Sequence, residues 1–194
     1  MKLLQFCRKA GNQLSVLGVR VIEGIDVSDA GSVRILQNQA GLEGLDWLIN
    51  NAGILSVDSL ESLDFEAMER QFRVNALGPL RVTRALLPKL APGSKIGIIT
   101  SRMGSVEDNT SGGYYGYRMS KAAVNMAGMS LARDLYERQI AVAMLHPGMV
   151  ATEMTGGRGI PVEKSAGGLI RRMDALDIKD TGSFWHAEGE RLPW

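Results

Sequence analysis

Tyr117 and Lys121 are the residues of this 194-residue chain whose types and spacing best suit acid–base chemistry. They stand four positions apart at the start of a helical pattern, so both side chains project from one face, about one turn apart. An ammonium ~4 Å from a phenol stabilises the phenolate by up to ~4 kcal/mol at an effective dielectric of 20, or about three pKa units. A tyrosine tuned in this way can donate a proton to a carbonyl oxygen or remove one from an alcohol. The alternative is an ordinary surface pair on an amphipathic helix.

Two further polar residues stand at places where they could assist. Ser101 follows the apolar run from Ile96 to Thr100, so its hydroxyl is expected at the carboxyl edge of a strand, within reach of a substrate carbonyl. Asn75 lies inside a long helical pattern, where asparagine is mildly unfavourable. By itself an asparagine at such a position is most often a solvent-facing residue or a local partner of the backbone.

Strands and helices alternate along the chain that must position these residues. Apolar runs rich in β-branched residues predict buried strands at Val19–Ile25, Trp47–Ile49, Ile96–Thr100 and Ile140–Leu145. Helical patterns predict helices from Ser28–Asp29 to Ala40, from Asp64 to Leu90 with an interruption at Gly78-Pro79, and from Tyr117 to Arg138. This alternation predicts an α/β fold with a doubly wound parallel sheet, Rossmann-like in its order, with ligands beyond the carboxyl ends of the strands.

The composition narrows the classes of protein that could carry this chemistry. The formal net charge is +1, so there is no basic field to hold nucleic acid or an anionic membrane. No apolar run approaches the ~18 residues that span a bilayer. The single cysteine, Cys7, cannot form an internal disulfide or a cysteine-rich metal site, and His146 has no second ligand at metal spacing. We expect a cytoplasmic protein of one domain that binds no metal, nucleic acid or membrane.

Five segments in a fixed order carry a resemblance to a known family. They are residues 46–53 (DWLINNAG), residues 74–76 (VNA), residues 99–101 (ITS), the Tyr117/Lys121 pair, and the PG-x-V-x-T string at residues 147–152. From about Asp26 to the C-terminus the chain resembles the short-chain dehydrogenase/reductase family. Its loop from Ser101 to Gly116 looks most like the carbonyl-reductase branch that includes the C-factor and sniffer-like proteins.

The resemblance implies a carbonyl–alcohol oxidoreductase with four catalytic residues. Tyr117 would be the general acid or base and would also contact the cofactor. Lys121 would lower the pKa of Tyr117 and hold the nicotinamide ribose. Ser101 would orient the substrate oxygen, and Asn75 would hold a proton-relay water near Lys121. The resemblance also implies a small-molecule carbonyl or alcohol as the substrate and a homodimer or tetramer as the assembly.

The same resemblance implies a dinucleotide site, with the hydride supplied by the cofactor. The positions that match the family's adenosine side are Asp26, Val27, Asn51, Ala52 and Gly53, and those that flank the nicotinamide are Pro147, Gly148, Val150 and Thr152. Cys7-Arg8 resembles the end of the family's second strand, where an arginine favours the 2′-phosphate, so NADP is expected in preference to NAD.

One family segment has no counterpart in the sequence. The glycine-rich turn that follows the first strand and opens the first helix is absent, and the six residues before Cys7 are too few to hold it. Its absence predicts an N-terminally truncated domain, with a gap and unpaired backbone between the strand Trp47–Ile49 and the strand Val19–Ile25. We expect Met1 to lie inside a longer natural protein. The alternative function is that of a catalytically impaired relative acting as an interaction or signalling protein.

Overall fold

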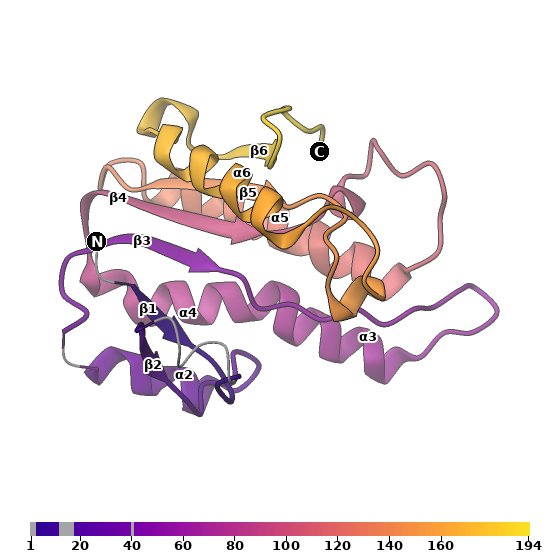
Figure 1. Ribbon diagram of the computed structural model, residues 1–194, viewed down its shortest axis with the longest axis horizontal. Coiled ribbons are helices and arrows are strands. Elements are labelled where there is room, and N and C mark those ends of the chain that lie inside the picture. Colours follow the sequence, from indigo (N-terminus) through magenta and orange to yellow (C-terminus); the bar gives the residue numbers. More distant parts are fainter. Residues whose placement is uncertain (1–2, 12–17, 40) are drawn as a thin grey trace.

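The computed structural model describes residues 3–11, 18–39 and 41–194. Parallel strands alternate with helices along them, which confirms the α/β fold (Figure 1). The strands are β1 (Leu4–Phe6), β2 (Arg20–Ile22), β3 (Leu45–Asn50), β4 (Leu90–Ile99), β5 (Ala141–His146) and β6 (Ser183–His186). The helices are α2 (Ala30–Arg34), α3 (Phe65–Phe72), α4 (Gly78–Leu86), α5 (Tyr115–Asp134) and α6 (Val162–Ala175), with a π-helix at Arg73–Leu77 between α3 and α4.

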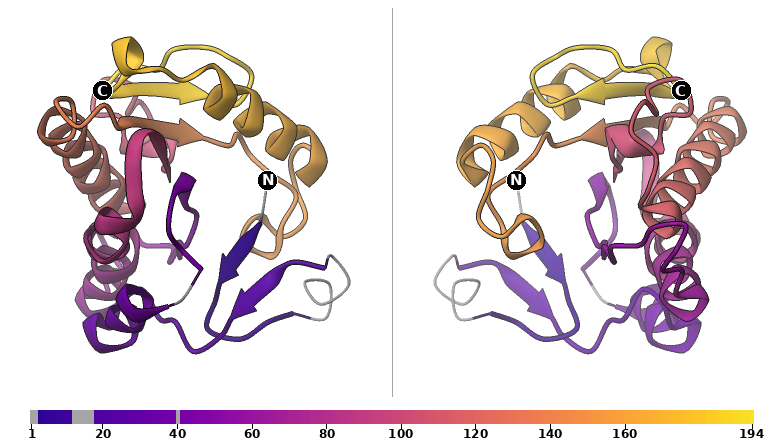
Figure 2. Two further views of the ribbon diagram at one scale, coloured as in Figure 1. Left: turned by 90° about the vertical axis from the view of Figure 1, so that its left-hand side faces the viewer. Right: turned by 90° about the vertical axis from the view of Figure 1, so that its right-hand side faces the viewer.

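The strands form two separate parallel sheets. One sheet has the order β3-β4-β5-β6, and the other is the pair β1-β2. The break confirms the predicted gap next to Trp47–Ile49, but the strand on its far side is β1, which no apolar run predicted and which ends just before Cys7. Figure 2 shows the β1–β2 pair set apart from the main sheet.

Helices cover both faces of the main sheet, as a doubly wound fold requires. On one face, Leu48, Ile96, Ile98, Val142 and Met144 belong to the same buried cluster as residues of α2, α4 and α5. On the other face, residues of β5 pack against Met173 and Leu176, in and just beyond α6. Because residues of β4 and β5 are buried on both faces, these strands read as continuous apolar runs, which is why the sequence revealed them.

Aspartates begin two of the predicted helices. The Asp29 carboxylate accepts hydrogen bonds from the first turn of α2, and the Asp64 carboxylate does the same for α3. The helix predicted to run on to Ala40 passes into a 3-10 turn at Ile35–Asn38, and Ala40 itself lies outside the described residues. The predicted break at Gly78-Pro79 is wrong: Gly78 follows the π-helix directly, and Pro79 occupies the first turn of α4, where proline is tolerated.

The helix α6 and the strand β6 were not predicted from the sequence. The sequence did predict the core of α5, but α5 begins two residues earlier than expected and ends four residues earlier, at Asp134. Within the described ranges, no helix is long and apolar enough to cross a bilayer.

Candidate active site

The first turns of α5 bring Tyr117 and Lys121 together beneath the carboxyl end of β4. Both side chains are buried, with 8% of Tyr117 and 4% of Lys121 exposed. The Lys121 ammonium lies 5.6 Å from the centroid of the Tyr117 ring and donates a 3.0 Å hydrogen bond to the Ile99 carbonyl at the end of β4. This burial argues against the alternative of a surface pair.

The pKa of Tyr117 does not follow the sequence-based expectation. Burial raises this pKa above its ordinary value, and the Ser101 hydroxyl opposes the rise. The predicted net lowering of this pKa is therefore wrong for this structure, because burial is the dominant influence on the phenol and the Lys121 ammonium donates its hydrogen bond to the Ile99 carbonyl. Burial also lowers the pKa of Lys121 to about 8. At neutral pH the site therefore holds a neutral phenol beside a charged ammonium, which is the pairing a proton donor needs.

Ser101 lies where the sequence predicted, immediately after β4. Its side chain is buried, caps the short 3-10 helix at Arg102–Gly104 by accepting from the Met103 amide, and interacts with Tyr117. Two hydroxyls, from Ser101 and Tyr117, therefore converge from a strand end and a helix. Such convergence can hold a single oxygen atom of a substrate between them.

Asn75 is buried, not solvent-facing, and its side chain hydrogen-bonds to two other segments of the chain. It lies in the π-helix, is 1% exposed, and its amide donates to the Ile54 carbonyl and to the Ser120 hydroxyl, both at 2.9 Å. Its oxygen accepts from the Ile54 amide at 2.8 Å. A Cβ atom on Gly53 would lie 3.5 Å from both the Asn75 oxygen and the Lys121 nitrogen, so these three residues meet at one point. Single π-turns of this kind are frequent at functional sites.

Asp58 is a positioning residue that no sequence pattern predicted. Its buried carboxylate accepts hydrogen bonds from the amides of Tyr115 and Gly116, the first residues of α5. This arrangement satisfies two amides that have no partner within the helix, and it fixes the turn that carries Tyr117. Asp58 lies 57 residues before the helix that it caps, so no local sequence pattern indicates this hydrogen bond.

A close approach of two backbones joins the Ser101 loop to α5. A Cβ atom on Gly104 would lie 2.7 Å from the carbonyl carbon of Lys121 and 2.9 Å from its Cβ. Neither atom can move without shifting the helix, so glycine is required here for space and not for its backbone conformation.

Gly104→Ala is expected to destabilise the protein by about 1–3 kcal/mol, because the added methyl group overpacks the contact with Lys121. Gly167→Ala is the matched control: this helical glycine of α6 meets only the end of the Arg171 side chain, at 3.6 Å, and alanine there should be neutral or stabilising. Urea unfolding of both variants measures the difference. Equal stability of the two variants would contradict the packing argument.

Several of the expected cofactor residues line one cavity of about 490 Å³. We call it the arginine cavity, because Arg8, Arg70 and Arg73 all line it. The predicted residues Arg8, Asp26, Val27, Ala52 and Gly53 lie there together. The Asp26 carboxylate accepts from the amide and the hydroxyl of Ser28, and these hydrogen bonds lower its pKa, so it stays ionised.

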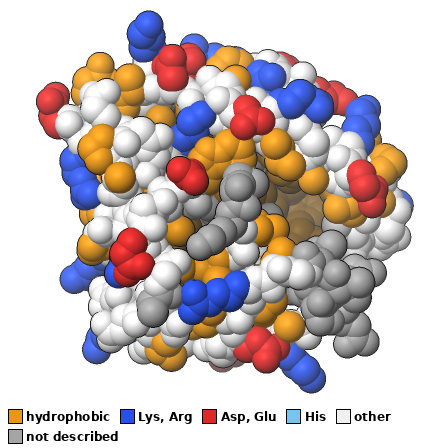
Figure 3. Space-filling model, turned by 60° about the vertical axis from the view of Figure 1, so that its left-hand side comes forward, with side chains coloured by type: hydrophobic (Ala, Val, Ile, Leu, Met, Phe, Trp, Pro, Cys, Tyr) orange, Lys and Arg blue, Asp and Glu red, His pale blue; other side chains and the backbone are white. Residues whose placement is uncertain are grey.

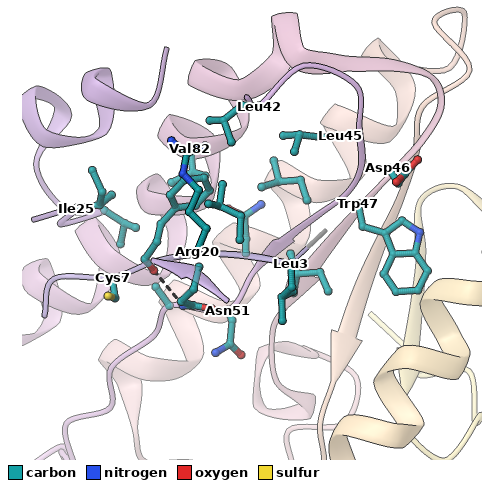
Figure 4. A pocket seen from close by; sticks show the side chains of 18 of the residues that line it. Leu3, Cys7, Arg20, Ile25, Leu42, Leu45, Asp46, Trp47, Asn51 and Val82 are labelled. Atoms are coloured by element: carbon teal, nitrogen blue, oxygen red, sulfur yellow. Dashed lines mark hydrogen bonds between the residues drawn. The ribbon is translucent and has the colours of Figure 1, made fainter. Parts of the chain in front are cut away.

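The remaining expected cofactor residues lie elsewhere. Asn51 lines a second cavity, between β1 and β3, which Figure 3 shows as a hollow with hydrophobic side chains inside it and Figure 4 shows from close by. Pro147, Gly148, Val150 and Thr152 follow β5 and line neither cavity. This segment is nevertheless held in place: the Pro147 carbonyl accepts from Ser165 of α6, and Val150 forms a parallel bridge with Ile160.

Two histidines meet at the ends of β5 and β6. The rings of His146 and His186 pack edge to face with centroids 5.0 Å apart. Burial lowers the pKa of His146 to about 4, so it is neutral at physiological pH. In the part of the chain that the structure describes, no three histidine, cysteine or acidic side chains gather as metal ligands would.

The chain is similar to proteins of a known family. The profile of the short chain dehydrogenase family matches residues 5–160. A 1-hydroxy-2-glutathionyl-2-methyl-3-butene dehydrogenase of Rhodococcus sp. (strain AD45) is 43% identical over 195 residues, which cover 97% of this chain and 86% of the relative. The C-signal protein of Myxococcus xanthus is 45% identical over 154 residues, covering 77% of this chain and 93% of that protein.

Solved structures of carbonyl reductases are also similar to this chain. The carbonyl reductase Sniffer of D. melanogaster superposes with a TM-score of 0.92 at 30% identity, and the NADPH-bound carbonyl reductase from chicken fatty liver with 0.91 at 28% identity. Each match covers all of this chain and 88% of the other. The resemblance carried by the five segments is thereby confirmed.

Proposed function

This chain belongs to the short-chain dehydrogenase family, and from that premise we propose that it interconverts a carbonyl and an alcohol, with Tyr117 as the general acid or base. The observation that carries the proposal is the buried junction of Tyr117, Ser101 and Lys121 at the end of β4. No other cluster of the described residues joins a buried phenol, a hydroxyl and an ammonium.

In the reducing direction, the Ser101 hydroxyl donates a hydrogen bond to the substrate oxygen and the Tyr117 hydroxyl delivers the proton to it. Burial keeps the phenol protonated before the substrate reacts. The Lys121 ammonium stabilises the phenolate that is left after proton transfer. Asn75 holds the Ile54 backbone and Ser120, and so fixes the loop that faces Lys121. A reduced nicotinamide, when bound, supplies the hydride.

The arginine cavity supports NADP as the dinucleotide. Three arginines line it, and a guanidinium is well suited to bind a 2′-phosphate. The chicken carbonyl reductase is described as NADPH-bound. Gly53 allows the cofactor to approach the backbone beside Lys121, and Pro147, Gly148, Val150 and Thr152 would flank the nicotinamide. No glycine-rich turn from strand to helix borders this cavity in the described chain. We therefore expect the pyrophosphate to bind more weakly than in family members that have this turn.

The gap between the two sheets bears on which elements the domain contains. We propose that residues 1–194 form one dehydrogenase domain without the family's first strand, glycine-rich turn and first helix. The break between β1 and β3 lies where that strand would pair.

The function is tested by incubating the purified 194-residue protein with NADPH and a panel of simple ketones and aldehydes, and following the loss of nicotinamide absorbance. We expect turnover with at least one of these small carbonyl compounds. Absence of turnover together with absence of NADPH binding would favour the alternative, an interaction protein without catalysis. The same experiment with NADH gives the cofactor preference.

We also propose that the protein is cytoplasmic and forms a homodimer or tetramer through α3 and α5. These helices pack side by side and leave two pairs of large apolar side chains exposed, each pair seven residues apart: Phe65 with Phe72, and Met119 with Met126.

Met126→Glu is expected to convert the assembly to monomers, because a carboxylate cannot be buried unpaired at the centre of an apolar interface. Light scattering at matched concentrations measures the mass. Met154→Glu, at an exposed methionine outside α3 and α5, is the control and should leave the mass unchanged. A monomeric wild-type protein would contradict the proposed assembly.

A further inference from the structure

One loop connects the two residues whose hydroxyls meet in the candidate active site. It leaves Ser101 after β4, passes through the 3-10 turn at Arg102–Gly104 and then through bends and turns, and reaches α5 just before Tyr117. Figure 1 shows this loop extending from the end of β4 and returning to the start of α5. We call residues 102–114 the active-site loop. Its path decides how Ser101 and Tyr117 face each other.

Arg118, in the first turn of α5, holds both ends of the active-site loop. At the end of the loop, its Nε donates to the Gly113 carbonyl at 3.1 Å, and its Nη2 donates to the Ser111 hydroxyl at 2.8 Å and the Gly112 carbonyl at 3.3 Å. At the start of the loop, its Nη1 donates to the Met103 carbonyl at 3.4 Å. A guanidinium has five N–H groups, and these four hydrogen bonds use all but one of them.

The end of the loop has a backbone conformation that depends on such contacts. Gly112, Gly113 and Tyr114 follow one another in the left-handed region, with φ angles of 63°, 63° and 53°. This conformation is costly for a tyrosine and persists only where the surrounding contacts hold it. Arg118 binds the carbonyls of both glycines, and the Asp58 carbonyl accepts from the Tyr114 amide. Arg118 and Asp58 together therefore fix the segment just before α5.

The start of the loop orients the Ser101 hydroxyl through Met103. The Met103 carbonyl accepts from Arg118, and the Met103 amide donates a 3.1 Å hydrogen bond to the Ser101 hydroxyl oxygen. A hydroxyl has two lone pairs and one hydrogen. Because the amide occupies a lone pair, the hydroxyl can donate its hydrogen into the site that it shares with Tyr117. Arg118 therefore acts on Ser101 through one intermediate residue.

A second arginine, Arg102, holds the middle of the loop at the surface. It forms ion pairs with Asp108 at 2.5 Å and with Glu190 at 3.1 Å, and the side chains of these three residues are between 31% and 57% exposed. Ion pairs at this exposure contribute little to stability. In the described chain, the hydrogen bonds that join the start of the loop to its end come from Arg118. We therefore expect the shape of the loop to depend on Arg118 more than on Arg102.

We propose that Arg118 is a positioning residue of the candidate active site, which sets the geometry between the Ser101 and Tyr117 hydroxyls by fastening both ends of the active-site loop. The proposal rests on the proposed function, since it concerns the alignment of two hydroxyls on one substrate oxygen. A misplacement of about 1 Å in an active site can cost about 10²-fold in rate. Loss of the Arg118 hydrogen bonds therefore lowers the rate without removing a group that touches substrate or cofactor.

The test replaces Arg118 with lysine, which keeps the positive charge but has one ammonium in place of the planar fork. Arg118→Lys should lower kcat for ketone reduction about 10- to 100-fold and change the Kd for NADPH less than about twofold. Hydrogen exchange of the free protein, followed by mass spectrometry, should become faster at residues 102–114 and stay unchanged in β4 and β5.

Two further variants sharpen this comparison. Arg133→Lys makes the same replacement in the last turn of α5, where the arginine is exposed, and should resemble the wild type in all three measurements. Ser111→Ala removes one of the four acceptors at the surface and is expected to fold. It should lower kcat by about two- to fivefold, less than Arg118→Lys does. If Arg118→Lys does not fold, an unchanged kcat in Ser111→Ala contradicts the proposal.

Four results with Arg118→Lys would overturn the proposal: an unchanged kcat, unchanged exchange in the active-site loop, faster exchange spread over the whole molecule, or a raised KM with kcat preserved. The third result would show a general loss of stability, and the fourth would make Arg118 a substrate contact. If the wild type turns over no carbonyl compound, the proposed function fails and the positioning role fails with it. An active wild type with an equally active Arg118→Lys contradicts the positioning role alone.

Discussion

Tyr117→Phe is expected to lower kcat for ketone reduction by roughly 10²- to 10⁴-fold, the usual contribution of a positioned general acid. The phenylalanine ring fills the same buried space and removes only the hydroxyl that delivers the proton. Binding of NADPH should change little, because the proton is transferred only when substrate reacts. The stability of the fold should also be retained.

Steady-state kinetics with the best ketone and fluorescence titration of NADPH separate these effects. Tyr136→Phe provides the matched control, since Tyr136 is exposed beyond the end of α5 and its loss should leave kcat unchanged. Retention of most of the activity by Tyr117→Phe would rule out the assigned mechanism. A large fall in NADPH affinity, with kcat preserved, would move Tyr117 from the chemistry to the binding of the cofactor.

Lys121→Met should lower kcat/KM for reduction at least 100-fold and, at neutral pH, leave the protein no less stable. The activity falls because the ammonium that stabilises the phenolate is lost. Wild-type activity in this direction should fall above pH 8, since the pKa of Lys121 is lowered to about 8 and the charge disappears there. Assays from pH 6 to 10 measure this decline.

The expected stability of Lys121→Met follows from the same lowering of the Lys121 pKa. The folded pKa is about 8 and the unfolded value 10.5, so between these pH values the unfolded chain holds a proton that the folded chain has released. Wild-type stability therefore gains from Lys121 as pH rises, by about 3 kcal/mol in full. Below pH 8 the full cost of burying the charge is present. Methionine removes that cost, and in exchange leaves the Ile99 carbonyl without its donor, at about 1–3 kcal/mol.

Urea unfolding of the wild type and Lys121→Met at pH 7 and pH 10 measures this difference. The variant should lose up to about 3 kcal/mol relative to the wild type as the pH rises, because only the wild type gains from the released proton. Lys164→Met, which removes a surface ammonium paired with Glu188, is the control and should show little pH-dependent difference. A pH-independent difference for Lys121→Met would mean that its ammonium is not desolvated in the folded protein.

The sequence revealed the elements whose signals are local. The Asp29 and Asp64 caps, the buried runs of β4 and β5 and the one-turn spacing of Tyr117 and Lys121 all follow from neighbouring residues. The strand β3 was also predicted as buried, but it leaves Ile49 46% exposed. The three-residue strand β1 is too short to show a period. The helix α6 begins after Pro161 with no capping side chain, so no side-chain cap marks its start in the sequence.

The properties that sequence could not give depend on contacts between distant segments. Asp58 holds the start of α5 from far upstream, and Gly104 is required only because Lys121 passes beside it. The pKa of Tyr117 was predicted from one neighbour four residues away. In the fold, burial by many residues outweighs that neighbour, and Lys121 is directed to a carbonyl.

The division of the strands into two sheets also bears on how the molecule opens. The pair β1–β2 has two strands of three residues each, and we treat it as one unit with the residues that follow, as far as Asn38. Among the described elements, this unit contacts the rest of the molecule through α2 and the 3-10 turn Ile35–Asn38, which both pack against α4. Such a unit is expected to behave as a separate foldon that unfolds locally at lower free energy than the main sheet. Arg8, Asp26 and Val27 belong to this unit and Gly53 to the other, so any ligand spanning the arginine cavity gives up part of its binding energy to hold the two foldons together.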